Sequence, residues 1–220
     1  MDRFEGTSLD CVRSTRTVFR ALAFSVSSGG ALVLVGPNGS GKSSLLRVMA
    51  GLLPQAAGTL SWNGANLAED PDAHRARLRY LGHLDAVKPA LTVTENLAFW
   101  AGLLGAEGEA VVPALDALGI GHLADLPARF LSAGQKRRLN LARLALRPAA
   151  LWLLDEPATA LDAETTDRLR NLIQKHRDGG GMAVVSTHSD LGLSGSDVLD
   201  VGRFSARRSA AFDDDGDAAA

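Results

Sequence analysis

The chain has 220 residues with 23 basic and 25 acidic side chains, a formal net charge of −2 and 46% hydrophobic residues. This balance is typical of one globular α/β unit and leaves no broad excess of cations for wrapping nucleic acid. Cys11 is the only cysteine, which excludes an intramolecular disulfide framework and a multi-cysteine metal cluster and favours the reducing cytosol.

Apolar patterning in the first third of the chain predicts a strand followed by a helix. The run at 32–35 ends at Gly36 and Pro37, as a buried strand does, and a helix is predicted from Lys42 to about Gly51. Residues 58–64 are predicted to form a strand and a turn, and residues 77–84 a further extended piece. The longest apolar runs fall far short of the roughly 20 residues of a membrane-spanning helix, so we expect no such helix here.

The middle of the chain has a helical pattern. Thr92 and Glu95 have the spacing of a capping box, and apolar residues on one helical face follow as far as Gly105. A second helix is predicted at 110–118. We therefore predict a helical subdomain at about 84–145, inserted into an α/β core.

Two further strands, at 150–154 and 182–186, flank a predicted helix at 164–176. Strand, helix, strand in this order implies a right-handed crossover and parallel strands. We predict one mixed sheet, a single domain over residues 1–205, and a flexible acidic tail at 206–220.

The strongest motif follows the first predicted strand and matches the phosphate-loop pattern Gly-x-x-x-x-Gly-Lys-Ser. Glycines let backbone N–H groups turn toward phosphate oxygens, and the helix start adds its dipole. Lys42 supplies a positive charge for the β and γ phosphates, and the Ser43 hydroxyl is placed to bind Mg²⁺. The candidate nucleotide-binding residues here are Gly36, Pro37, Asn38, Gly39, Ser40, Gly41, Lys42, Ser43 and Ser44.

Two adjacent carboxylates follow the strand at 150–154. Parallel sheets bind ligands at the carboxyl ends of their strands, so Asp155 is predicted to hold Mg²⁺ and Glu156 to act as the general base for an attacking water. An acidic turn after a strand would look the same in isolation. The accompanying phosphate loop favours the catalytic interpretation.

A second capping pair, Ser132 and Gln135, opens another predicted helix. Its start presents a hydroxyl, the Gly134 backbone and a positive dipole, which suit an anion. We interpret the basic side chains of this helix as a solvated face, with contact to nucleotide, membrane or partner as the alternative. These side chains are Lys136, Arg137, Arg138 and Arg143.

Together these motifs resemble the nucleotide-binding subunits of ATP-binding-cassette (ABC) transporters, from about residue 9 to 188. The resemblance implies a P-loop ATPase fold with an inserted helical subdomain, using ATP and Mg²⁺ as a head-to-tail homodimer. It makes residues 131–135 the signature loop, with Ala133 where glycine is usual. Ser132, Gly134 and Gln135 would bind the ATP of the partner subunit. His188 would stabilise the γ-phosphate, and Asp162 would link the two sites.

Two positions depart from the family pattern. His83 stands where the loop that couples ATP to the membrane partner normally carries glutamine, and an imidazole cannot replace both roles of a carboxamide. Arg13 and Arg16 stand near the place where many members stack an aromatic ring on adenine. Any stacking there would fall to a guanidinium.

Residues 80–83, 88–97 and 131–138 are similar to the ATPase subunits of the cytochrome c maturation system. This similarity implies a membrane partner of the CcmB type, with CcmC and CcmD nearby, and no nucleic acid. It implies a peripheral place on the cytoplasmic face of the inner membrane, without insertion of the chain itself. ATP would drive haem export or the release of a haem-loaded chaperone.

Other functions remain as alternatives. The subunit of another ABC exporter or importer would carry the same motifs, and so would a soluble ABC-type ATPase of DNA repair or translation. The latter usually has two cassettes or a long coiled-coil insertion. A GTPase lacks support because the chain has no Asn-Lys-x-Asp motif, and a nucleotide kinase would not explain residues 131–135.

Overall fold

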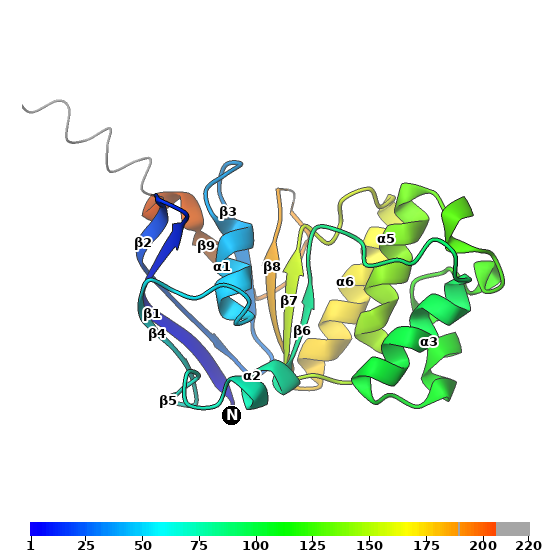
Figure 1. Ribbon diagram of the computed structural model, residues 1–220, viewed down its shortest axis with the longest axis horizontal. Coiled ribbons are helices and arrows are strands. Elements are labelled where there is room, and N and C mark those ends of the chain that lie inside the picture. Colours follow the sequence, from blue (N-terminus) through cyan, green and yellow to red (C-terminus); the bar gives the residue numbers. More distant parts are fainter. Residues whose placement is uncertain (189, 206–220) are drawn as a thin grey trace, which may run out of the picture.

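A parallel sheet with strand order β6-β7-β8-β3-β9 crosses the middle of the computed structural model, which describes residues 1–188 and 190–205 (Figure 1). Its strands are β3 (Ala31–Val35), β6 (Leu78–Leu81), β7 (Leu151–Asp155), β8 (Met182–Ser186) and β9 (Asp197–Asp200). Every residue of β7 and β8 is buried, as expected for central strands covered on both faces. The three predicted buried strands are confirmed, and so is the parallel pairing predicted for the strands at 150–154 and 182–186. The predicted tail at 206–220 lies outside the described residues.

A second, antiparallel sheet has the order β2-β1-β4-β5. Its strands are β1 (Arg3–Arg13), β2 (Arg16–Ser27), β4 (Ala57–Trp62) and β5 (Ala65–Asn66). The prediction of one mixed sheet is therefore wrong. Every pairing in the sheet of β3 is parallel, and the antiparallel strands pair with one another instead, so the two kinds of pairing are in separate sheets.

The helices divide between the two sides of the parallel sheet. In Figure 1, α1 (Lys42–Met49) lies between the two sheets, whereas α3 (Val93–Leu104), α5 (Ala133–Ala142) and α6 (Ala163–Asp178) lie on the other side. The short α4 (Val111–Ala117) contacts α3 and α5. One helix that the sequence did not predict, α2 (Pro71–Arg77), precedes β6. No helix in the described part of the chain is both long and apolar enough to span a membrane.

Short 3₁₀ turns connect these elements. They are η1 (Gly108–Ala110), η2 (Gly121–Leu123), η3 (Ala128–Phe130), η4 (Arg143–Ala145) and η5 (Val201–Phe204). Both predicted capping boxes are confirmed, at Thr92 with Glu95 and at Ser132 with Gln135. The boundaries of the helical subdomain stay a prediction.

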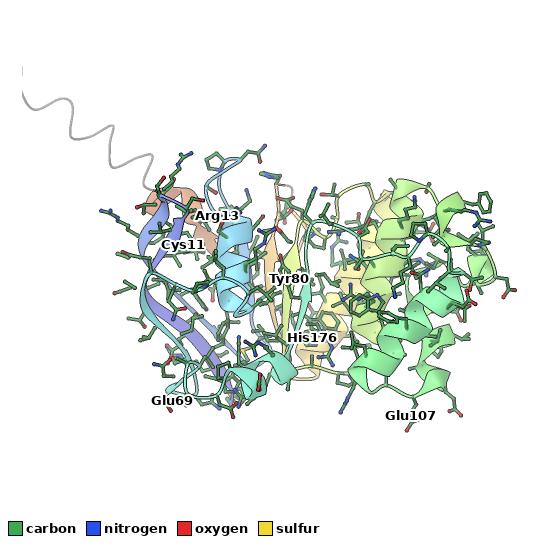
Figure 2. All side chains as sticks on the ribbon, viewed as in Figure 1. Cys11, Arg13, Glu69, Tyr80, Glu107 and His176 are labelled. Atoms are coloured by element: carbon green, nitrogen blue, oxygen red, sulfur yellow. The ribbon has the colours of Figure 1, made fainter. Side chains whose placement is uncertain are left out.

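Two hydrophobic cores hold β7 from opposite faces. Leu151 and Leu153 belong to the core shared with α1 and the antiparallel sheet, and Trp152 and Leu154 to the core shared with the helices. Side chains fill the spaces on both sides of the sheet (Figure 2). Since successive side chains of a strand point to opposite faces, β7 is fixed from both sides. Its last residue, Asp155, is thereby placed rigidly at the strand end.

Candidate active site

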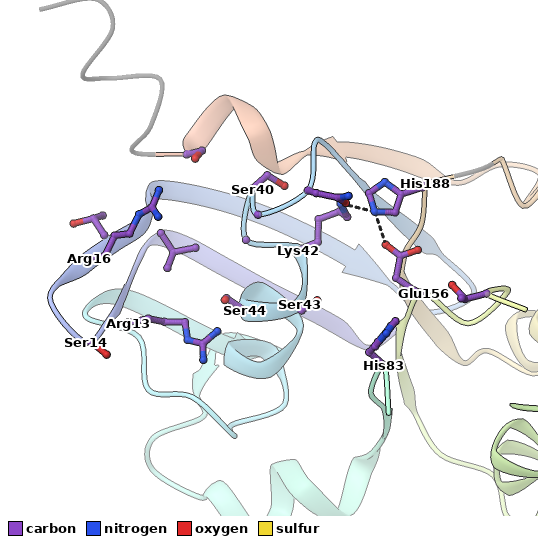
Figure 3. A pocket seen from close by; sticks show the side chains of 17 residues that line it. Arg13, Ser14, Arg16, Ser40, Lys42, Ser43, Ser44, His83, Glu156 and His188 are labelled. Atoms are coloured by element: carbon purple, nitrogen blue, oxygen red, sulfur yellow. Dashed lines mark hydrogen bonds and ion pairs between the residues drawn. The ribbon is translucent and has the colours of Figure 1, made fainter. Parts of the chain in front are cut away.

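A pocket of about 790 Å³ opens beside the loop that joins β3 to α1 (Figure 3). Figure 3 shows Arg13 and Arg16 on one side of this loop and Glu156, His83 and His188 on the other. Most of the predicted phosphate-loop residues line the pocket: Asn38, Gly39, Ser40, Gly41, Lys42, Ser43 and Ser44. Gly36 and Pro37 contribute through their carbonyl groups instead, as described below.

The loop needs glycine at Gly41, which caps the start of α1. Gly41 has a φ of +110°, and a β-carbon built there would lie 2.7 Å from Val18 Cγ1. Any side chain at this position would collide with β2. Gly41 therefore presents only backbone to the pocket at the helix start, where the dipole favours an anion.

Lys42 places a cation in the pocket wall although its side chain is largely buried. Its Nζ donates to the Gly36 carbonyl at 2.8 Å and to the Pro37 carbonyl at 3.5 Å. The same atom lies 3.4 Å from His188 Nε2. Because the two carbonyl partners carry no charge, they leave the charge of Lys42 available to an anion in the pocket.

Asp155 is 1% exposed and connects the phosphate loop to the sheet. Its Oδ1 accepts hydrogen bonds from the Ser43 hydroxyl at 3.0 Å and the Ser186 hydroxyl at 2.7 Å. Its Oδ2 is buried and has no hydrogen-bond partner among the described residues. A buried carboxylate oxygen without a partner is unfavourable, and hard oxygen ligands are those that Mg²⁺ prefers. Ser43 and Asp155 therefore fit a magnesium ion.

Glu156 adopts a left-handed backbone, with φ of +51°. Such a conformation costs about 1–3 kcal/mol for a non-glycine residue, so its surroundings must hold it. Its N–H donates to the Ser186 hydroxyl at 3.0 Å and carbonyl at 3.2 Å. The turn presents the Glu156 carboxylate to the pocket, where Oε1 lies 3.0 Å from His188 Nε2. A His188 tautomer whose Nε2–H donates to Glu156 cannot also accept a hydrogen bond from Lys42 at Nε2.

Arg137 is a site residue that the sequence interpretation missed. It is 4% exposed, and its guanidinium donates to the backbone directly after β7. The interpretation of these basic side chains as a solvated face is also wrong for Arg143, the first residue of η4, whose guanidinium lies 3.4 Å from the Trp100 ring centroid. Burial, and then the nearby charge of Arg79, lower the pKa of Arg143 to about 10. Nothing in the local spacing distinguishes these arginines from exposed ones.

The predicted signature residues lie elsewhere. Ser132, Gly134, Gln135 and Asp162 line a separate cavity of about 310 Å³. Arg138 also lines it and pairs with Asp162 at 2.6 Å. The structure thus brings the phosphate loop together with His83, Asp155, Glu156 and His188, but does not bring the signature residues to them. The roles predicted for both sets stay predictions.

Comparison with known proteins agrees with this geometry. The family model for ABC transporters matches residues 19–159. The chain is 57% identical, over 91% of its length and 94% of the relative, to the cytochrome c biogenesis ATP-binding export protein CcmA of Paramagnetospirillum magneticum. It is 56% identical to the CcmA of Rhodospirillum rubrum, over 91% of this chain and 86% of that one.

Solved structures share the fold. A putative ABC transporter ATP-binding protein from Pyrococcus furiosus superposes with a TM-score of 0.80 at 22% identity, over 92% of this chain and 99% of its own. The α/β prediction is confirmed by this likeness. The chain therefore belongs to the ABC transporter family and, within it, to the group of ATP-binding proteins that contains CcmA.

Proposed function

We propose that this chain is the ATP-hydrolysing subunit of an ABC transporter complex for cytochrome c biogenesis. The observation that carries the proposal is the pocket lined by Lys42, Ser43, Glu156 and His188, with Asp155 hydrogen-bonded to Ser43. The names of the relatives support the biological setting.

ATP would enter this pocket with its phosphates against the backbone of the phosphate loop and the Lys42 ammonium. Arg13 and Arg16 stand at the other side of the loop, where a guanidinium can stack on a base. Ser43 and Asp155 would hold a magnesium ion, which neutralises charge on the phosphates when bound.

Hydrolysis needs a base beside the γ-phosphate. Glu156 would accept a proton as water oxygen bonds to the γ-phosphorus and the bond to the ADP oxygen breaks, yielding ADP and phosphate. His188 would hold the Glu156 carboxylate through the 3.0 Å contact and stabilise the γ-phosphate. The low exposure of the Glu156 side chain, 17%, limits competing contact with bulk water.

The complex would contain two copies of the chain, head to tail, on a CcmB-like membrane subunit with CcmC and CcmD nearby. Ser132, Gly134 and Gln135 would then face the ATP of the opposite copy, which accounts for their distance from the pocket of their own copy. Asp162 would link the two sites, and His83 would couple ATP to the membrane subunit. The chain would sit on the cytoplasmic face of the inner membrane. ATP would drive haem export or the release of a haem-loaded chaperone.

Two measurements on the tagged full chain, purified from detergent-solubilised membranes, test this proposal. Mass spectrometry should identify a CcmB-like protein among the co-purifying proteins, and the preparation should hydrolyse ATP when Mg²⁺ is present. Recovery of a different permease would keep the ATPase and remove the cytochrome c assignment. Absence of Mg²⁺-dependent hydrolysis from a preparation that contains the partner would overturn the enzymatic proposal.

A further inference from the structure

Arg137 joins three segments that border the proposed ATP site. It lies on α5, five residues after Ser132, and its buried guanidinium makes hydrogen bonds through all three nitrogens. Nε donates to the Pro157 carbonyl at 3.2 Å. Nη2 donates to the carbonyls of Asp155 at 2.9 Å and Glu156 at 2.7 Å.

The remaining nitrogen contacts a different segment. Nη1 donates to the Gly82 carbonyl at 3.2 Å and to Asp85 Oδ1 at 3.1 Å. These two residues flank His83, which lines the pocket. One side chain therefore connects the helix of the signature residues, the turn that carries Glu156, and the segment that carries His83.

The contacts act on the backbone that sets the direction of Glu156. Its left-handed conformation is held at the N–H by Ser186 and at the carbonyl by Arg137. Asp155, Glu156 and Pro157 are consecutive, so restraining three successive carbonyls leaves this turn little freedom. A planar guanidinium with five N–H donors can bind several oxygens at once, whereas a lysine ammonium acts as a point charge.

We propose that Arg137 is a positioning residue for ATP hydrolysis, which holds the Glu156 carboxylate in its working direction and ties that direction to the His83 segment and to α5. The inference rests on the proposed function, because it assigns Glu156 as the base. Arg137 does not line the pocket, so it acts on hydrolysis through Glu156 and leaves ATP binding to the phosphate loop.

The test compares Arg137→Gln with Lys136→Gln in the full chain purified together with its membrane partners. Lys136 is the neighbouring cation on α5 and does not line the ATP pocket, so its variant controls for lost charge. We expect Arg137→Gln to lower kcat by roughly 10- to 100-fold, the loss that a small misplacement of a reacting group causes. KM and the affinity for a fluorescent ATP analogue should change less than about twofold, as for an interaction that matters only during reaction. An unchanged kcat would overturn the inference.

A second comparison separates positioning from general support of the fold. In a Glu156→Gln background, Arg137→Gln should cause no further loss of the residual turnover, measured with radiolabelled ATP, because its effect passes through Glu156. The same fold loss in both backgrounds would overturn the inference.

Two milder variants keep the test decisive if Arg137→Gln does not fold. Arg137→Lys should bind ATP normally and show an intermediate kcat, because the single nitrogen of a lysine cannot replace all the hydrogen bonds of the guanidinium. Asp85→Asn should lower kcat less, because the three carbonyl contacts after β7 remain. Parallel losses of ATP affinity and kcat in the lysine variant would show a structural role and overturn the inference. A wild-type complex without ATPase activity would instead count against the proposed function.

Discussion

The pocket at the phosphate loop and the cavity at Ser132 differ in what their charged groups contact. At the pocket, Lys42 and the Asp155–Glu156 pair come from segments far apart in the sequence. Lys42 donates to two backbone carbonyls, and one Asp155 oxygen has no hydrogen-bond partner in the described structure. In the cavity, Arg138 and Asp162 pair with each other. Ser132 and Gln135 already serve as the cap of α5. The pocket thus has groups that suit the proposed binding and chemistry, and the cavity suits the proposed contact with a second copy.

The largest expected effect concerns the catalytic chemistry proposed for the pocket. Glu156→Gln removes the proton acceptor but keeps the size of the side chain, so turnover of the complex should fall by roughly 10²- to 10⁴-fold, the usual contribution of a general base. ATP affinity should persist. Steady-state phosphate release measures the loss, with the exposed Glu164→Gln on α6 as control. Normal turnover of the complex would remove Glu156 as the base.

The next effect concerns binding at the pocket. Lys42→Ala deletes a buried cation beside the expected phosphates, and loss of such a contact costs about 2–5 kcal/mol. ATP affinity should therefore fall by at least about 30-fold, measured by equilibrium binding of a fluorescent analogue. Lys175→Ala, at an exposed position of α6, is the matched control. Unchanged affinity would mean that phosphates bind elsewhere.

A smaller effect tests the cavity. Ser132→Ala and Thr92→Ala each remove the same kind of helix cap, so both should lower stability by about 1 kcal/mol. Only Ser132→Ala should lower turnover of the assembled complex, by roughly tenfold for one lost charge-assisted hydrogen bond to phosphate. Affinity for ATP at the pocket of the same copy should not change. Equal turnover of the two variants would remove Ser132 from the contact surface.

The smallest expected effect concerns the packing of α6 against β7. His176 of α6, labelled in Figure 2, stacks on Trp152 of β7 with ring centroids 3.8 Å apart and is partly buried. Burial holds the pKa of His176 below its ordinary value of 6.5, partly offset by the hydrogen bond to the Met182 carbonyl. The unfolded chain therefore takes up a proton as pH falls through 6.5, which the folded chain resists.

Stability should accordingly decrease on acidification. Thermal unfolding should show a lower Tm just below pH 6.5 than above it, and His176→Phe should reduce that difference. His74, whose pKa burial also lowers, should account for part of the remainder. His122→Gln, at an exposed position, should leave the difference as in the wild type. A pH dependence that survives intact in His176→Phe would contradict this linkage.

The parts of the molecule that sequence predicted well are those whose signals are local. The phosphate loop, the strand before Asp155 and both capping boxes are each defined within a few consecutive residues. The antiparallel sheet has no such signal, since β1 and β2 contain left-handed residues at Ser8 and Ala21 and several shifts of register. These irregularities interrupt the alternation of apolar and polar residues that identifies a strand.

Arg137 shows a different reason for failure. On a helix start with several basic residues, an arginine is indistinguishable from its solvated neighbours. Its partners are backbone oxygens that every residue possesses, 18 to 20 positions away at 155–157 and 55 away at Gly82. Only the folded chain shows that these oxygens converge on one side chain.

The strand order also determines when the pocket can exist during synthesis. β3 is made early but lies between β8 and β9, which are made last, and its pocket joins Ser43 to a residue 112 positions later and Lys42 to one 146 positions later. Such distant contacts slow folding, because a long loop must close before they form. A nascent chain therefore emerges with a complete phosphate-loop sequence but no nucleotide site. If ATP binds at this pocket as proposed, it can stabilise only chains in which these distant contacts have formed, so nucleotide binding would report their formation.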